Sequence, residues 1–200
     1  MSIFLVPIAL AMVVLANPIV SVAFGRGEFT LEKVTITAQA MQFYCISVIS
    51  LGWRQIMEKV FYAMEDTKTP MVNSVISIVV NIVLNLILIR FMQHRGLALA
   101  TTVSSVLTAM LFFVNLQKKI GNFGGRKLFD SFCKTGIAAL VMAFVMKLMF
   151  AFSGLVIQSV VINLMVTSVV GMVVYYVMLQ TLHVHELTVA VGMIQRRLKK

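Results

Sequence analysis

Six stretches of this chain are apolar over the length needed to cross a lipid bilayer. A membrane-spanning helix requires about 20 consecutive, mostly apolar residues. The stretches are continuous and do not alternate between apolar and polar residues, which favours helices over the strands of a β-barrel. The sequence therefore predicts an all-α integral membrane protein with six transmembrane helices. Their predicted ranges are 3–24, 35–64, 71–89, 97–116, 132–152 and 155–182.

The composition excludes the common soluble classes. Of the 200 residues, 60% are hydrophobic and 12% are charged, whereas soluble domains have about 45–50% and about 25%. A soluble fold of this size could not cover so much apolar surface, and disordered chains are poor in apolar residues. The net charge of +10 would indicate nucleic-acid binding in a soluble protein. Here we interpret it as cationic loops facing an anionic lipid leaflet, and we expect no nucleic-acid partner.

Basic residues are divided unevenly between the connections. If the connections lie alternately on the two sides of the membrane, eleven Lys and Arg residues fall on one side and four on the other. The positive-inside rule places the richer side in the cytoplasm. Because the number of spans is even, both ends of the chain are then expected to be cytoplasmic.

These features divide the chain into four predicted segments. Residues 1–117 form a bundle of four spans, and residues 118–131 form a basic cytoplasmic loop. Residues 132–182 add two further spans, and residues 183–200 form a basic cytoplasmic tail. Within the first span, Pro18 predicts a kink, which membrane helices tolerate when neighbouring groups satisfy the freed carbonyl.

Polar side chains follow one face of the third span and one face of the fourth. These two helices are expected to form a hairpin around Gln93, with Asn85 and Thr101 at a similar depth and Asn81 about one turn deeper. One interpretation is that the polar residues hold the helices together by interhelical hydrogen bonds. The alternative is a polar cavity wall or a site for a small cation such as sodium, formed by the oxygens of Asn81, Asn85 and Thr101. The polar residues are Asn73, Ser77, Asn81 and Asn85 on the third span and Thr101, Ser104, Ser105 and Thr108 on the fourth.

The second span contains two charged residues, Arg54 and Glu58, four positions apart. They could neutralise each other within the membrane, where an unpaired charge is costly. Alternatively, Arg54 lies at the cytoplasmic rim beside Trp53, or it faces a polar cavity and binds an anionic substrate with its guanidinium.

The remaining polar residues indicate packing and no catalysis. Asn163, Thr167, Gly171 and Tyr175 lie four apart on the sixth span and predict a helix-packing face. His183 and His185 are two apart, which does not favour a metal site. The sequence has no phosphate-binding glycine loop, Ser/His/Asp set or metal-ligand cluster, so we expect neither an enzyme nor a cofactor beyond the sodium ion considered above.

Three stretches carry a resemblance to a known family. They are Pro18-Ile19-Val20 followed by residues 24–30, then residues 61–70 (FYAMEDTKTP), and residues 96–101 (GLALAT). In this order and spacing they resemble the MurJ (MviN) lipid II flippases of the multidrug/oligosaccharidyl-lipid/polysaccharide exporter superfamily. The resemblance implies the C-terminal portion of such a transporter: a partial MurJ-like bundle with part of the second lobe and two additional helices. Met1 is then expected to be an internal position.

The resemblance also implies a function. Family members move the undecaprenyl-pyrophosphate-linked peptidoglycan precursor from the cytoplasmic to the outer leaflet of the bacterial inner membrane, by alternating access, for cell-wall synthesis. The implied partners are this precursor, membrane lipids and the missing N-terminal half. Asn81, Asn85 and Thr101 match positions of a sodium-coupled arrangement in some members, with Asn85 in place of an acid. No headgroup-binding residue is carried over, because the segments that line the central cavity lie mainly outside this chain.

Two alternatives remain open at this point. A related polysaccharide-lipid flippase or cation-coupled drug exporter would have the same architecture. The other alternative is a membrane fragment that does not transport.

Overall fold

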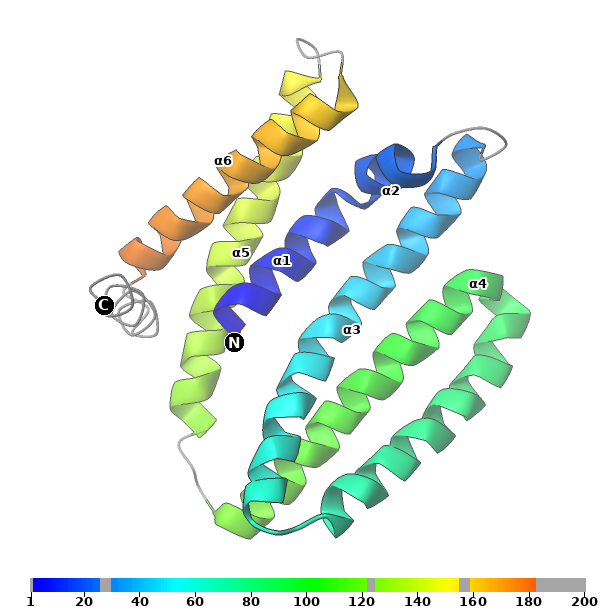
Figure 1. The fold of residues 1–200 in the computed structure, drawn as a ribbon, viewed down its shortest axis with the longest axis vertical. Helices are drawn as coiled ribbons and strands as arrows, with labels where there is room; N and C mark the ends of the chain where they lie inside the picture. The colour runs from blue at the N-terminus through cyan, green and yellow to red at the C-terminus, as the bar shows by residue number, and fades with distance from the viewer. Residues whose placement is uncertain (1, 26–29, 122–124, 155–158, 183–200) are drawn as a thin grey trace, which may run out of the picture. The chain divides into compact units, whose positions relative to one another are not determined.

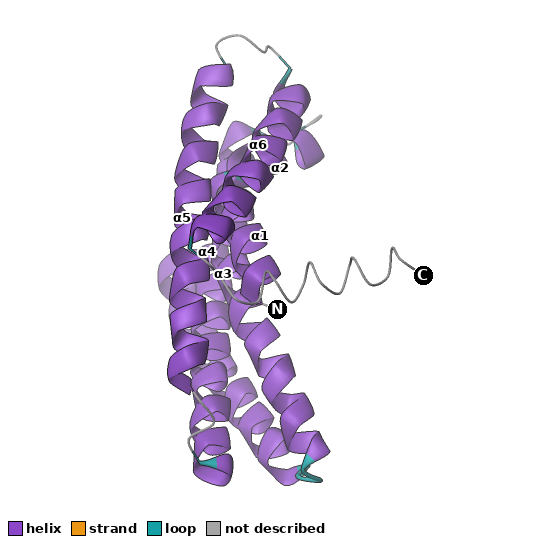
Figure 2. Ribbon diagram, turned by 90° about the vertical axis from the view of Figure 1, so that its left-hand side faces the viewer, coloured by secondary structure: helices purple, strands orange, loops and turns teal. Residues whose placement is uncertain are grey.

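The computed structural model describes residues 2–25, 30–121, 125–154 and 159–182. The regular elements within these ranges are all α-helices (Figures 1 and 2). The expected all-α fold is therefore confirmed for this part of the chain. The helices are α1 (Ser2–Val14), α2 (Ala16–Phe24), α3 (Leu31–Ala63), α4 (Lys68–Ile120), α5 (Gly125–Ser153) and α6 (Val160–Thr181).

Five helical segments of the described chain are long and apolar enough to cross a membrane, and α1 with α2 gives a sixth if the pair is one broken span. Their positions agree with the six predicted ranges, although α3 begins at Leu31 and α5 at Gly125, ahead of the predicted spans. The predicted tail, with His183 and His185, lies outside the described residues. The five segments are Leu31–Ala63, Lys68–Met92, Arg95–Ile120, Asp130–Ser153 and Val160–Thr181.

The first predicted span is interrupted rather than continuous. Helix α1 ends at Val14, and α2 begins at Ala16. A proline ring excludes the carbonyl four residues before it and removes the N–H that would bond that carbonyl. For Pro18 that carbonyl belongs to Val14, the last residue of α1. The expected kink at Pro18 is therefore a full break in the helix at Leu15.

The helices pack as two compact units. One unit comprises residues 1–14 and 124–200 and contains α1, α5 and α6, and the other comprises residues 15–123 and contains α2, α3 and α4. Each unit is described by itself below.

In the first unit, α6 packs through the face predicted from its spacing. Asn163, Thr167, Gly171 and Tyr175 are all buried, and Leu179 extends the same face. A Cβ atom on Gly171 would lie 2.6 Å from Sδ of Met146 on α5, so the absence of a side chain allows the close helix contact. The hydroxyl of Ser153 donates to Asn163 Oδ1 and closes the α5–α6 end of this interface.

A second proline in this unit has a partner for the carbonyl that it frees. Pro7 lies inside α1, so the carbonyl of Ile3, four residues earlier, receives no helical N–H. The buried Tyr175 of α6 donates its phenolic hydroxyl to this carbonyl oxygen at 2.7 Å. A polar group that would be unsatisfied inside a membrane protein is thereby paired across two helices.

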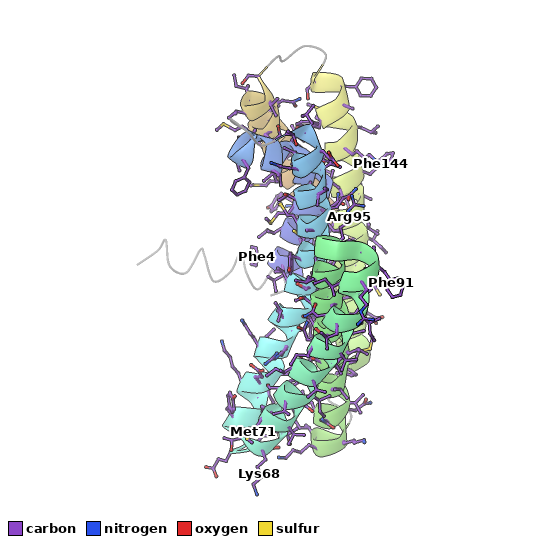
Figure 3. All side chains as sticks on the ribbon, turned by 90° about the vertical axis from the view of Figure 1, so that its right-hand side faces the viewer. Phe4, Lys68, Met71, Phe91, Arg95 and Phe144 are labelled. Carbon is purple, nitrogen blue, oxygen red and sulfur yellow. The ribbon has the colours of Figure 1, made fainter. Side chains whose placement is uncertain are left out.

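In the second unit, α4 turns back on itself to form a hairpin (Figure 1). Its arms are Lys68–Met92 and Arg95–Ile120, with the turn around Gln93 as predicted. Figure 3 shows Phe91 and Arg95 at the bend and Lys68 and Met71 at the opposite end of the hairpin. A Cβ atom on Gly96 would lie 2.5 Å from the carbonyl oxygen of Leu88, so the turn requires glycine at this position.

Two apolar clusters hold the second unit together. Ala16 and Val20 of α2 pack on Val34 and Ala38 of α3. Further along α3, the fully buried rings of Phe61 and Phe112 meet edge to face, with centroids 5.9 Å apart. Met57 and Leu116 complete this second cluster. The outer face of the first α4 arm is apolar and exposed, with Leu86 at 65% exposure, as suits a hydrocarbon environment.

Candidate functional site

The polar residues of α4 connect the two arms of the hairpin by hydrogen bonds between side chains. Asn81 Nδ2 donates to Ser104 Oγ at 2.9 Å, and Thr108 Oγ1 donates to Ser77 Oγ at 2.7 Å. Nearer the open end, Asn115 Nδ2 donates to Asn73 Oδ1 at 2.9 Å. These three contacts form a polar ladder inside an otherwise apolar hairpin, where each bond contributes about 0.6–2 kcal/mol.

The structure brings two of the three proposed cation ligands directly together. Asn85 Nδ2 donates to Asn81 Oδ1 at 2.9 Å. The hydroxyl of Thr101 instead donates to the Leu97 carbonyl of its own helix at 2.9 Å. Thr101 joins the network through its backbone carbonyl, which accepts a hydrogen bond from Ser104 at 3.0 Å.

One atom of this network has no hydrogen-bond partner. Oδ1 of Asn85 is buried and unpaired. A buried amide oxygen without a donor is costly to leave unsatisfied, and amide oxygens are suitable ligands for hard cations. No group of three or more His, Cys, Asp or Glu residues that could hold a metal ion occurs in the part of the chain that was described.

Arg54 and Glu58 lie on α3 and form an ion pair. Arg54 Nε donates to Glu58 Oε1 at 2.6 Å, and the two side chains are 26% and 20% exposed. Arg54 Nη2 also donates to Ser74 Oγ on the first arm of α4 at 3.1 Å. Its guanidinium carbon lies 5.8 Å from the centre of the Phe112 ring on the second arm. Arg54 therefore links α3 to both arms of the hairpin, and its charge is balanced within its own helix.

The connection between α3 and α4 forms a polar centre that the sequence reasoning did not single out. Asp66 accepts hydrogen bonds from the Thr69 backbone N–H at 3.0 Å and from the Thr69 hydroxyl at 2.6 Å, which caps the start of α4. Its carboxylate also pairs with Lys119 Nζ at 2.6 Å. The Lys119 contact, followed by the bonds from Thr69, holds the pKa of Asp66 well below its ordinary value.

This arrangement gives a physical reason for the stretch FYAMEDTKTP. Phe61 lies in the apolar cluster, and Glu65 adopts a positive φ of 58° at the turn. Pro70 occupies the first turn of α4, where its missing N–H needs no partner. The acidic residue three positions before Thr69 is a capping signal that could have identified the role of Asp66 from the sequence.

The described helices, their apolar exterior and the internal polar hairpin define a polytopic α-helical membrane protein. A family model described as "Lipid II flippase MurJ" matches residues 1–170. The chain is 34% identical to a probable lipid II flippase MurJ of Haemophilus influenzae over 137 residues, which are 68% of this chain and 27% of the relative. It is 31% identical to the probable lipid II flippase MurJ of Bdellovibrio bacteriovorus over 119 residues, or 59% of this chain and 23% of the relative.

A solved structure has the same fold. It is a lipid II flippase MurJ in an inward closed conformation, with a TM-score of 0.77 and 21% sequence identity, covering 94% of this chain and 37% of that chain. The chain belongs to the MurJ family of lipid II flippases. It spans 23% to 28% of the length of the first three curated relatives that it matches.

Proposed function

We propose that this chain forms the C-terminal part of a lipid II flippase, which moves the undecaprenyl-pyrophosphate-linked peptidoglycan precursor from the cytoplasmic to the outer leaflet. The observation that carries the proposal is the family match over residues 1–170, supported by the shared helical fold. The role is transport rather than catalysis. We place the protein in the bacterial inner membrane, with both ends of this chain in the cytoplasm on the basis of the Lys and Arg distribution.

The physical task explains why a complete transporter is needed. The precursor has a sugar–peptide headgroup and a pyrophosphate, and every unsatisfied polar group in hydrocarbon costs several kcal/mol. Two lobes that rock around a central polar cavity can expose the headgroup to each side in turn. Because this chain contributes only part of that architecture, we expect that it requires the N-terminal portion to transport the precursor.

Depletion and complementation test the proposal. In cells depleted of the full-length protein, we expect lipid II to accumulate in the inner leaflet, followed by lysis. Residues 1–200 alone are expected not to rescue these cells, whereas co-expression with the N-terminal portion is expected to restore translocation. Sensitivity to drugs without any change in lipid II translocation would instead indicate a related exporter of the superfamily. If the N-terminal portion alone rescued the depleted cells, residues 1–200 would have no part in transport.

We further propose that Asn81, Asn85 and Thr101 contribute to a site for a small cation, with sodium as the candidate. The supporting observation is the buried Asn85 Oδ1, which has no donor. In the full-length protein, Asn85→Leu and Asn81→Leu are expected to abolish the sodium dependence of transport. Ser77→Ala on the same helix face is the matched control and should retain it. Unchanged sodium dependence in both Asn variants would exclude the site.

We also propose that Arg54 and Glu58 are charges of the substrate cavity, where the Arg54 guanidinium binds an anionic substrate during the transport cycle. In the alternative, the two charges only neutralise each other, as they do in this structure. The paired variants described in the Discussion separate the two.

A further inference from the structure

The open end of the α4 hairpin contains a pocket with a cavity volume of about 310 Å³. Lys68, Thr69 and Asn73 from the first arm line one side, and Asn115 and Lys119 from the second arm line the other. Phe61 of α3 supplies part of the apolar wall. The pocket is distinct from the Asn81–Asn85 network, since Asn81 lies two helical turns further along the first arm.

Asn73, which lines this pocket, has an unpaired donor. The residue is only 2% exposed, and its Oδ1 already accepts a hydrogen bond from Asn115 at 2.9 Å. Its Nδ2 is buried and has no hydrogen-bond partner. An amide nitrogen only donates, so the group that would satisfy it is an acceptor and not a cation.

The charges around the pocket also favour an anion. Lys68 is exposed at the start of α4 and forms no ion pair with any residue that the structure describes. Lys119 uses one of its N–H groups for Asp66, and an ammonium has three donors. The carboxylate of Asp66 is engaged by Lys119 and Thr69, so its charge is balanced locally.

We propose that this pocket binds the phosphate group of an anionic phospholipid. A phosphate offers several acceptor oxygens, enough for Asn73 Nδ2 and both lysines at once. The pocket's lining residues Lys68 and Lys119 lie near the ends of the two membrane-spanning arms, and Figure 3 shows Lys68 at this end of the hairpin. The ends of spanning helices lie at the level of the lipid headgroups. The pocket's apolar wall of Phe61 and Val72 suits the glycerol and first acyl carbons. The site is independent of the flippase function proposed above.

Lipid titration of the purified full-length protein by native mass spectrometry tests the proposal. Phosphatidylglycerol is the anionic probe, phosphatidylcholine is the zwitterionic probe, and inorganic phosphate is added in a separate arm. We expect saturable binding of phosphatidylglycerol, with an apparent Kd raised about tenfold or more by Lys68→Gln or Asn73→Leu, as for loss of a charge-assisted bond.

The controls are two exposed lysines that do not line the pocket, Lys59→Gln and Lys118→Gln. Both should bind phosphatidylglycerol as the native protein does. Lys68 is exposed, so Lys68→Gln reports on binding even if Asn73→Leu fails to fold. If the native protein, the pocket variants and the control variants bound phosphatidylglycerol with equal affinity, the pocket would not be the binding site. Displacement of the lipid by equimolar inorganic phosphate would overturn the assignment to a phospholipid.

Discussion

Asp66, before the first residue of α4, and Lys119, beside its last residue, are joined by an ion pair of 2.6 Å across 53 positions of sequence. The same carboxylate caps the helix start through Thr69. One side chain therefore fixes the beginning of the hairpin and ties it to the end. This explains why the short connection between α3 and α4 is polar although both helices are apolar.

The stability contributed by Asp66 should depend on pH. Its folded-state pKa is lowered from the ordinary value of 3.8, so its contribution is complete above that value and is lost as the pH falls through the folded-state pKa. At neutral pH, Asp66→Asn should melt a few degrees below the native protein, and the difference should shrink well below pH 3.8. Thermal melting in detergent across this range measures it. Glu65→Gln is the control, and a pH-independent difference for Asp66→Asn would contradict the prediction.

Replacing Gly96 should open the hairpin turn. In Gly96→Ala the new Cβ would meet the Leu88 carbonyl oxygen at 2.5 Å, and overpacking of this kind costs about 1–3 kcal/mol. Gly136 is the matched control, because a Cβ there has no atom within 4 Å. Gly136→Ala should stabilise its helix by about 0.5–1 kcal/mol. Melting temperatures that fall equally for both variants would refute the role of the close approach.

Arg54 and Glu58 can be tested as a pair. Arg54→Leu leaves the Glu58 carboxylate without its partner and should destabilise the protein by about 1–3 kcal/mol. The double variant Arg54→Leu/Glu58→Leu removes both charges and should recover much of that stability. If the pair is only structural, the double variant also recovers transport. If the double variant is as stable as the native protein but does not transport, the result would instead support contact between Arg54 and the substrate.

The Tyr175 hydroxyl should matter only while Pro7 is present. Tyr175→Phe leaves the Ile3 carbonyl without a donor and should cost about 1 kcal/mol. In Pro7→Ala the residue regains an N–H that can bond this carbonyl within α1. We therefore expect Tyr175→Phe to have little effect in the Pro7→Ala background. A double-mutant cycle of unfolding free energies checks this, and additive effects would show that the Tyr175 hydroxyl does not compensate for the N–H that Pro7 lacks.

Local periodicity predicted much of this fold. The number and position of the spans, the hairpin around Gln93 and the packing face from Asn163 to Tyr175 all depend on residues close in sequence. The consequences of the two internal prolines could not be predicted in the same way. Pro7 is accommodated within α1 because the carbonyl that it frees, that of Ile3, accepts from a hydroxyl 172 positions further along the chain. At Pro18, in contrast, α1 ends four residues before the proline.

The candidate site shows the same limit. Spacing placed Asn85 and Thr101 at a similar depth with Asn81 about one turn deeper, and the two asparagines are bonded to each other. The rotamer of Thr101, which directs its hydroxyl to Leu97, is set by local competition for acceptors that spacing does not reveal. The partners of Arg54 on both arms of α4 depend on how three helices meet, and no single segment contains that information.

The interruption at Leu15 has a consequence for biosynthesis. Helices α2, α3 and α4 pack on neighbours that are synthesised in immediate succession, whereas α1 packs on α5 and α6, which are synthesised after α4. The Ile3 carbonyl must therefore wait until Tyr175, 172 positions later, has been synthesised. We expect nascent chains arrested before α5 to have a protease-sensitive α1 alongside an already protected hairpin.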